Sequence, residues 1–194
     1  MTFYPPKIYE RFASPKNGVV VDDANAGGKS ASFQCGSFVS FSLRVDAETK
    51  TVTSAGFQTN GCGYMIASAD FLVETIKFSK LSDLHGLNKE ELSQKIDREF
   101  GILPNERRQC VDVCIEALRV AFAVYRVRQI EEFRGEKALI CTCFGVSEET
   151  IEAHIKQDSL ETVDEVTQIC NAGGGCGSCR MLIQEMIDTR NDHI

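Results

Sequence analysis

The sequence of 194 residues has no tryptophan, only 3 histidines and 4 prolines, and no apolar run long enough to cross a membrane. Basic residues are also in the minority, because 21 lysines and arginines face 28 acidic residues and leave a net charge of −7. Nucleic-acid binders usually carry a basic excess, so we expect no nucleic-acid partner. The first twelve residues, MTFYPPKIYERF, lack the apolar segment of a secretory signal. We therefore expect a cytoplasmic protein without a membrane partner.

Cysteine is the residue type that is present in excess, with 9 copies. A chain of this length buries roughly 70% of its unfolded surface, so folding does not require disulfides. Thiols stay reduced in the cytosol, and an odd number of them argues against a closed disulfide framework. The cysteines therefore need another explanation. Their uneven spacing suggests two modules, with cysteines at positions 35, 62, 110 and 114 and then at 141, 143, 170, 176 and 179.

The first module is predicted to combine a sheet with helices. Residues 38–45 alternate apolar and polar side chains, and we expect them to form an antiparallel hairpin with residues 51–59. Residues 25–28 have the composition of a loop. Apolar periodicity and capping residues predict helices at 4–11, 65–78, 88–100 and from 104 to about 127. We expect an α+β domain over residues 1–133, in which the sheet packs on the helices.

The second module, residues 138–190, is predicted to be small and mostly helical. Charged residues around Gly135 indicate the boundary. Ser147 is placed to cap a helix that ends near residue 157, and Thr162 forms a capping box with Glu165. A glycine-rich loop over 171–178 leads into a last predicted helix.

Four cysteines of the second module form two close pairs, Cys141-x-Cys143 and Cys176-x-x-Cys179, which 32 residues separate. Each pair is predicted on a loop beside a helix start, where free backbone N–H groups can donate to sulfur. The spacing favours an iron–sulfur cluster over zinc, because zinc pairs more often have two to four intervening residues. Buried structural cysteines are the remaining alternative.

The segments around these pairs, ICTCFGVS at 140–147 and GGGCGSC at 173–179, resemble the bacterioferritin-associated-ferredoxin-like 2Fe-2S domain found in the middle of NifU proteins. The resemblance covers about residues 138–188. It implies that a permanent 2Fe-2S cluster is ligated by Cys141, Cys143, Cys176 and Cys179.

Three cysteines of the first module are scattered in the sequence. Cys35 precedes the predicted hairpin, Cys62 follows it and opens a helix, and Cys110 lies in the last helix. If the sheet packs on the helices, all three meet at one end of the module. A thiol at a helix start has a lowered pKa, which makes it a better ligand and nucleophile. Taken alone, three separate cysteines are more often core residues.

Two segments of this module, YERFASPKNG at 9–18 and GCGYMIAS at 61–68, resemble the NifU/IscU scaffold family, and the similarity extends over about residues 3–128. Proteins of this family assemble a labile cluster on three cysteines, with persulfide sulfur from a cysteine desulfurase, and pass it to apo-proteins. The resemblance implies that Cys35, Cys62 and Cys110 are the ligands and that Cys110 accepts the persulfide. It also suggests a homodimer.

The chain departs from the family's pattern at the scaffold site. The family usually has Asp at the position of Ser37 and His at the position of Gln109, and a hydroxyl and an amide are poor iron ligands beside thiolates. The family's chaperone-binding segment is altered to LPNER at 103–107. Cys114 follows Cys110 by one helical turn, which makes it a candidate fourth ligand or resolving thiol. The alternative for Cys114 is a buried small hydrophobe.

The sequence therefore predicts an iron–sulfur cluster assembly scaffold without the third domain of NifU, a carrier rather than an enzyme. Its expected partners are a cysteine desulfurase and apo iron–sulfur proteins, and its expected cofactors are a permanent 2Fe-2S cluster and a transient cluster in the N-terminal module. Two alternatives stay open. One is a degenerate scaffold that acts as a 2Fe-2S electron-transfer or redox-sensing protein, and the other is a zinc-bound sulfur acceptor. Cys170 has no predicted role beyond packing.

Overall fold

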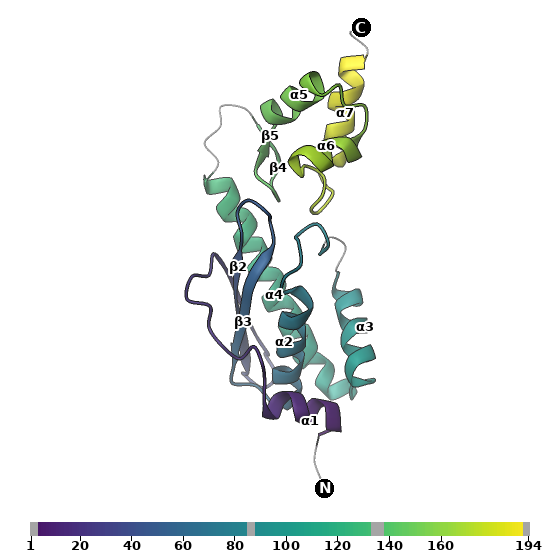
Figure 1. The fold of residues 1–194 in the computed structure, drawn as a ribbon. Helices are drawn as coiled ribbons and strands as arrows, with labels where there is room; N and C mark the ends of the chain where they lie inside the picture. The colour runs from purple at the N-terminus through teal and green to yellow at the C-terminus, as the bar shows by residue number, and fades with distance from the viewer. Residues whose placement is uncertain (1–3, 85–87, 133–137, 192–194) are drawn as a thin grey trace. The chain divides into compact units, whose positions relative to one another are not determined.

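The computed structural model describes residues 4–84, 88–132 and 138–191 (Figure 1). The chain divides into two compact units. The first comprises Met1–Lys80 and Leu87–Tyr125, and the second comprises Leu81–Gly86 and Arg126–Ile194. The boundary expected at 133–137 falls outside the described residues and stays a prediction. Each helix that the structure describes is too short or too polar to cross a membrane.

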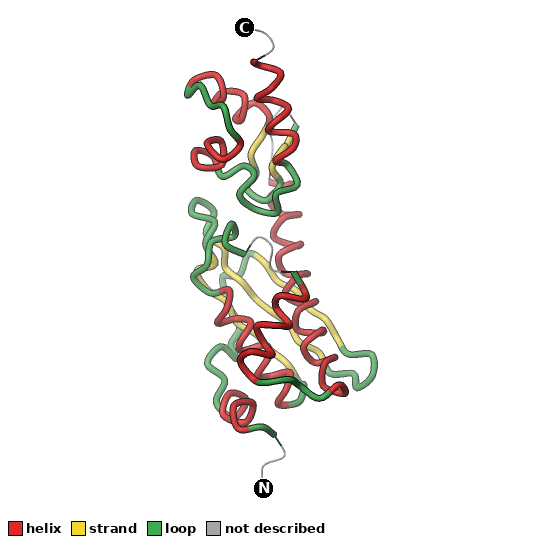
Figure 2. Tube along the Cα trace, turned by 90° about the vertical axis from the view of Figure 1, so that its right-hand side faces the viewer, coloured by secondary structure: helices red, strands yellow, loops and turns green. Residues whose placement is uncertain are grey.

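The first unit contains a three-stranded antiparallel sheet in the order β1-β2-β3, with helices packed on it (Figure 2). The strands are β1 (Ala26–Ala31), β2 (Phe38–Val45) and β3 (Val52–Thr59). The helices are α1 (Pro6–Ala13), α2 (Gly63–Ile76), α3 (Lys89–Phe100) and α4 (Asn105–Glu132), the last of which continues into the second unit. The alternation predicted for β2 is real, because Val39, Phe41, Leu43 and Val45 are all buried. The expected α+β architecture of the first module is confirmed.

In the first unit, strand β1 is an element that the sequence did not predict, since its first residues have loop composition. Its place in the sheet depends on a close approach to α4. A Cβ added to Gly28 would lie 2.1 Å from the carbonyl oxygen of Ala117 and 2.3 Å from the backbone nitrogen of Ala121. Only glycine fits at this point, so tertiary packing decides the strand where local propensity does not. The loop that follows β1 is thereby brought beside α4.

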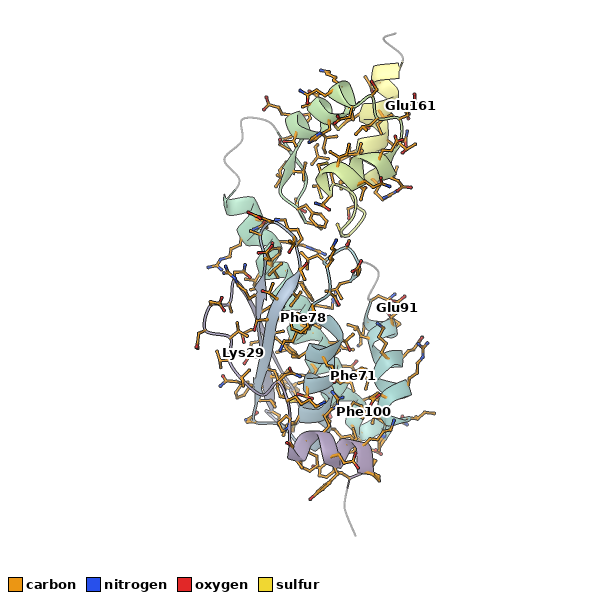
Figure 3. All side chains as sticks on the ribbon, viewed as in Figure 1. Lys29, Phe71, Phe78, Glu91, Phe100 and Glu161 are labelled. Carbon is orange, nitrogen blue, oxygen red and sulfur yellow. The ribbon has the colours of Figure 1, made fainter. Side chains whose placement is uncertain are left out.

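A buried carboxylate joins the N-terminal segment to α2. Asp70 is 1% exposed and accepts hydrogen bonds from Asn17 N at 2.8 Å, Asn17 Nδ2 at 3.1 Å and Arg11 Nη1 at 3.2 Å. The Arg11 guanidinium also lies over the rings of Phe71 and Phe100, which are neighbours in Figure 3. This network fixes α1 and the following turn against α2.

The second unit is small and mostly helical, as expected. A two-stranded ribbon of β4 (Leu139–Cys141) and β5 (Val146–Ser147) leads into α5 (Glu148–Gln157), α6 (Val163–Cys170) and α7 (Arg180–Asn191). The Ser147 side chain caps α5, and Thr162 with Glu165 forms the predicted capping box of α6. The core of the unit is formed by buried aliphatic side chains, chiefly Ile151, Ile155, Val166, Ile183 and Ile187.

Candidate metal centres

The first candidate site is a contact between two thiols that are 48 positions apart in the sequence. The sulfur atoms of Cys62 and Cys110 lie 3.6 Å apart. Cys62 is the N-cap residue of α2, and Cys110 lies in the second turn of α4. The packing of these two helices therefore produces the pair, and this part of the expected meeting of cysteines is present in the structure.

The environment of the pair favours one thiolate and one thiol. A hydrogen bond from Cys110 lowers the pKa of Cys62 to about 5, against the opposing effect of burial. The backbone N–H groups of Met65 and Tyr64 at the start of α2 and the charge of Arg107 lower it further. The same hydrogen bond and burial raise the pKa of Cys110. A stable thiolate in this position can act as a metal ligand or as a nucleophile.

Cys35 is exposed in the β1–β2 loop, which Ser32 organises. The Ser32 hydroxyl accepts a hydrogen bond from the Cys35 N–H at 3.4 Å and donates one to Oε1 of Gln109 at 3.1 Å. Hydrogen bonds from Ser32 and then from Ser37 lower the pKa of Cys35, while the nearby charge of Cys62 has the opposite effect. The loop that carries Cys35 is thus tied to the α4 residue that directly precedes Cys110.

Gln109 and Ser37 both lie at the site, and both interact with protein groups. The Gln109 amide oxygen holds Ser32, and its Nε2 donates to the Glu106 carbonyl at 3.4 Å. Ser32 is a site residue that the sequence analysis missed. A serine three residues before a cysteine is typical of a side-chain-capped turn, and that spacing is the signal that points to it.

Cys114 lies next to the pair and is fully buried, with 0% exposure. Its thiol donates to the Met65 carbonyl at 3.6 Å, and burial raises its pKa. A negative charge on Cys114 would raise the pKa of Cys110 further. A role for Cys114 as a fourth ligand stays a prediction.

The second candidate site consists of two pairs of hydrogen-bonded thiols. Cys141 at the end of β4 pairs with Cys179, which directly precedes α7. Cys143, in the turn between β4 and β5, pairs with Cys176. Within the described residues, no group of three or more Cys, His, Asp or Glu side chains stands ready to hold a metal ion.

Hydrogen-bond donors surround the sulfur atoms of the second site. A hydrogen bond from Cys179 lowers the pKa of Cys141 to about 6, against the effect of burial, and the Gly173 N–H contributes in the same direction. Burial opposes ionisation of Cys176, yet the Ser178 hydroxyl, 3.2 Å from its sulfur, and the Ser178 N–H lower its pKa. Such donors stabilise the charge of a thiolate-bound cluster and tune its potential.

The glycine-rich loop approaches the thiols closely. A Cβ added to Gly175 would lie 2.6 Å from the Cβ of Cys143 and 2.9 Å from its sulfur. The Cys176 N–H donates to the Cys143 sulfur at 3.4 Å, and the Thr167 hydroxyl holds the loop by donating to the Ala172 carbonyl at 2.7 Å. The two hydrogen-bonded thiol pairs and the backbone donors around them have the donor chemistry that a 2Fe-2S cluster uses, so the residue types present fit this group.

Cys170 stands outside both sets of thiols. It is half-buried and donates to the Val166 carbonyl at 3.2 Å, within the last turn of α6. Burial raises its pKa, which is typical of a packed thiol.

Comparison with known proteins identifies both modules. Residues 3–132 match the family model of the NifU-like N terminal domain, and residues 139–189 match that of the BFD-like [2Fe-2S] binding domain. The chain therefore belongs to the NifU family. The resemblance that the cysteine motifs indicated is confirmed.

Three proteins illustrate the similarity. The nitrogen fixation protein NifU of Azotobacter chroococcum mcd 1 is 35% identical over 184 residues, which cover 95% of this chain and 58% of that protein. The iron–sulfur cluster assembly scaffold protein IscU of Aquifex aeolicus is 29% identical over 150 residues, or 77% of this chain and 92% of that protein. The solved N-terminal structure of a NifU-like protein from Brucella abortus is 18% identical, with a TM-score of 0.42, over 66% of this chain and 94% of that one. The chain thus spans about three fifths of the length of the NifU protein of Azotobacter chroococcum.

Proposed function

We propose that this chain is a cytoplasmic scaffold for iron–sulfur cluster assembly, a carrier and not an enzyme. Iron and sulfur are its substrates in the first unit, where Cys35, Cys62 and Cys110 receive them. A cysteine desulfurase supplies the sulfur as persulfide, and apo iron–sulfur proteins take up the finished cluster. The observation that carries the proposal is the 3.6 Å contact of Cys62 and Cys110 beside the Cys35 loop, in a chain of the NifU family.

The geometry of the first site suits a cluster that is built and then released. Cys62 and Cys110 are held by helices, whereas Cys35 is exposed on a loop. Two fixed thiols can hold a growing cluster while the third gives way to an acceptor protein. Cys110 is only 3% exposed, so a protein donor reaches Cys35 or Cys62 more easily unless α4 moves.

The second unit is proposed to hold a permanent 2Fe-2S cluster on Cys141, Cys143, Cys176 and Cys179. The two thiol pairs, the Gly175 approach and the surrounding backbone donors support this assignment. Such a cluster supplies one-electron transfer when it is bound. The protein's part is to fix the four cysteines and to donate backbone hydrogen bonds to their sulfurs. The glycine at position 175 lets the loop come this close, because a larger side chain there would overlap Cys143.

A second candidate function is that of a 2Fe-2S electron-transfer or redox-sensing protein whose scaffold site has degenerated. The observation in its favour is that the Gln109 amide oxygen is engaged with Ser32 and that Ser37 offers only a hydroxyl in place of a carboxylate. The first site would then lack a strong fourth ligand. A zinc-bound sulfur acceptor is the third outcome that an experiment must distinguish.

Anaerobic reconstitution tests these functions against one another. The chain is incubated with a cysteine desulfurase, cysteine and ferrous iron, and bound iron and sulfide are counted for the wild type and for a Cys35/Cys62/Cys110 triple serine variant. A scaffold gives additional iron and sulfide on the wild type, and this labile fraction transfers to an apo-ferredoxin. If both proteins keep the same single cluster and neither transfers it, the scaffold function is wrong. Zinc retained by the purified wild type, together with sulfur loading and no cluster, identifies the zinc-bound acceptor.

The second site has its own test with a matched control. Cys141→Ser should abolish the visible absorbance of the resident cluster, because it removes a ligand. Cys170→Ser changes a nearby thiol that stands outside the two pairs, and it should leave the absorbance intact. Equal loss in both variants would contradict the ligand assignment.

A further inference from the structure

The contact of Cys62 and Cys110 has a chemical use besides metal ligation. We propose that these two thiols form an internal dithiol reductant that converts a persulfide carried by one of them into free sulfide. The inference rests on the proposed function in one respect, namely that sulfur arrives at this site as persulfide. It adds a step to that function, because a persulfide sulfur must gain two electrons before it can bridge iron as sulfide.

The geometry places the second thiol where it can attack. In the reduced chain the Cys62 sulfur lies 3.6 Å from the Cys110 sulfur, close to the separation of reacting atoms in a productive arrangement, so it faces the inner sulfur of a persulfide on Cys110. A disulfide needs a sulfur separation of about 2.05 Å, so the two sulfurs must close by roughly 1.5 Å. The attacking group is held at the N-cap of α2, and the sulfur that it attacks is held in α4.

The step balances in atoms and electrons. The Cys62 thiolate attacks the inner sulfur of the Cys110 persulfide, a bond forms between the Cys62 and Cys110 sulfurs, and the bond to the outer sulfur breaks. The outer sulfur leaves with that electron pair as HS⁻. Two cysteine sulfurs are oxidised to a disulfide, and one sulfane sulfur is reduced to sulfide. An external dithiol reduces the disulfide before the next round.

The other thiols of the first unit are less suited to this step. Cys35 interacts with Ser32 and Ser37 on its loop. Cys114 is fully buried and donates its proton to the Met65 carbonyl. If the persulfide forms first on the more exposed Cys62, the same contact places the Cys110 sulfur against it, and attack by Cys110 gives the same disulfide and the same HS⁻.

The experiment loads sulfur without a desulfurase, so that it can succeed or fail independently of the proposed function. The reduced chain is treated anaerobically with glutathione persulfide, and released sulfide and the state of each cysteine are measured by a sulfide assay and mass spectrometry. Wild type, Cys62→Ser and, as a matched control, Cys170→Ser are compared, and circular dichroism verifies that each variant is folded.

We expect the wild type and Cys170→Ser to release about one sulfide per chain more than Cys62→Ser and to acquire a disulfide between Cys62 and Cys110. The Cys62→Ser chain should retain its persulfide and release sulfide at least about tenfold more slowly, because it loses a nucleophile held in contact. The inference is overturned if Cys62→Ser releases sulfide at the wild-type rate, or if the disulfide forms between other cysteines of the first unit. It is equally overturned if the wild type keeps its persulfide or takes up no sulfur. If the disulfide forms as expected and desulfurase-driven cluster assembly fails, the proposed function is wrong and the dithiol chemistry stands.

Discussion

Replacing Asp70 with alanine should destabilise the first unit far more than replacing its neighbour Glu74. Both carboxylates contact Arg11, Asp70 at 3.2 Å and Glu74 at 2.8 Å, but Asp70 is 1% exposed and the Glu74 side chain is 50% exposed. Asp70 also accepts two hydrogen bonds from Asn17. Breaking such a buried pair costs about 3–5 kcal/mol, because the two Asn17 donors lose their buried acceptor and Arg11 keeps only the exposed Glu74. An exposed ion pair contributes about 1 kcal/mol or less, so Glu74→Ala should be nearly silent.

The natural tyrosines make the measurement specific to the first unit. The chain has no tryptophan, and all four tyrosines belong to the first unit, at positions 4, 9, 64 and 125. Urea unfolding followed by tyrosine fluorescence therefore reports this unit alone. A loss of about 3–5 kcal/mol is a large part of the roughly 5–15 kcal/mol that stabilises a typical domain. If Asp70→Ala and Glu74→Ala shift the free energy of unfolding equally, with unchanged denaturant dependence, the reasoning from burial is refuted.

Three further changes test the packing and the thiols. Gly28→Ala should destabilise the first unit by about 1–3 kcal/mol or prevent β1 from pairing, since the new methyl group would overlap backbone atoms of α4, and hydrogen exchange in β1 will detect this. Cys110→Ala removes the hydrogen bond that lowers the pKa of Cys62 to about 5. The midpoint of the pH dependence of Cys62 alkylation by iodoacetamide should therefore move upward, toward the ordinary thiol range. An unchanged pH profile would show that Cys110 is not the cause of the lowered pKa. Ser32→Ala removes the largest of the hydrogen bonds that lower the pKa of Cys35, so alkylation of Cys35 at neutral pH should become slower, and a serine-to-threonine change, which keeps the hydroxyl, should restore it.

Local patterns predicted most of the fold. The alternation over 38–45 predicts strand β2, and the apolar stripe of 65–78 predicts helix α2. Both can be recognised because burial of one face makes apolar residues recur at a fixed spacing within a short segment. Strand β1 lacks such a pattern, since its first three residues are Ala26, Gly27 and Gly28. What makes it a strand is its contact with a helix about ninety positions later, and no short window of sequence contains that information.

The two sites differ in the same way. The cysteines of the second site form two pairs that are each close in sequence, so their spacing alone predicts a four-thiolate centre. The partners of the first site are far apart, with 48 positions between Cys62 and Cys110 and 77 between Ser32 and Gln109. The family resemblance predicted that the cysteines share one site. The Ser32–Gln109 hydrogen bond results from packing between distant segments, and no short sequence motif predicts it.

The hydrogen bond between Ser32 and Gln109 also determines how the Cys35 loop responds to acidity. A histidine changes charge near neutral pH, whereas a glutamine amide stays neutral over the whole range in which proteins remain folded. The tie between this loop and α4 is therefore made of two groups that do not titrate. Acidification would therefore leave the Ser32–Gln109 anchorage of the Cys35 loop unchanged, whereas the thiols beside it do titrate.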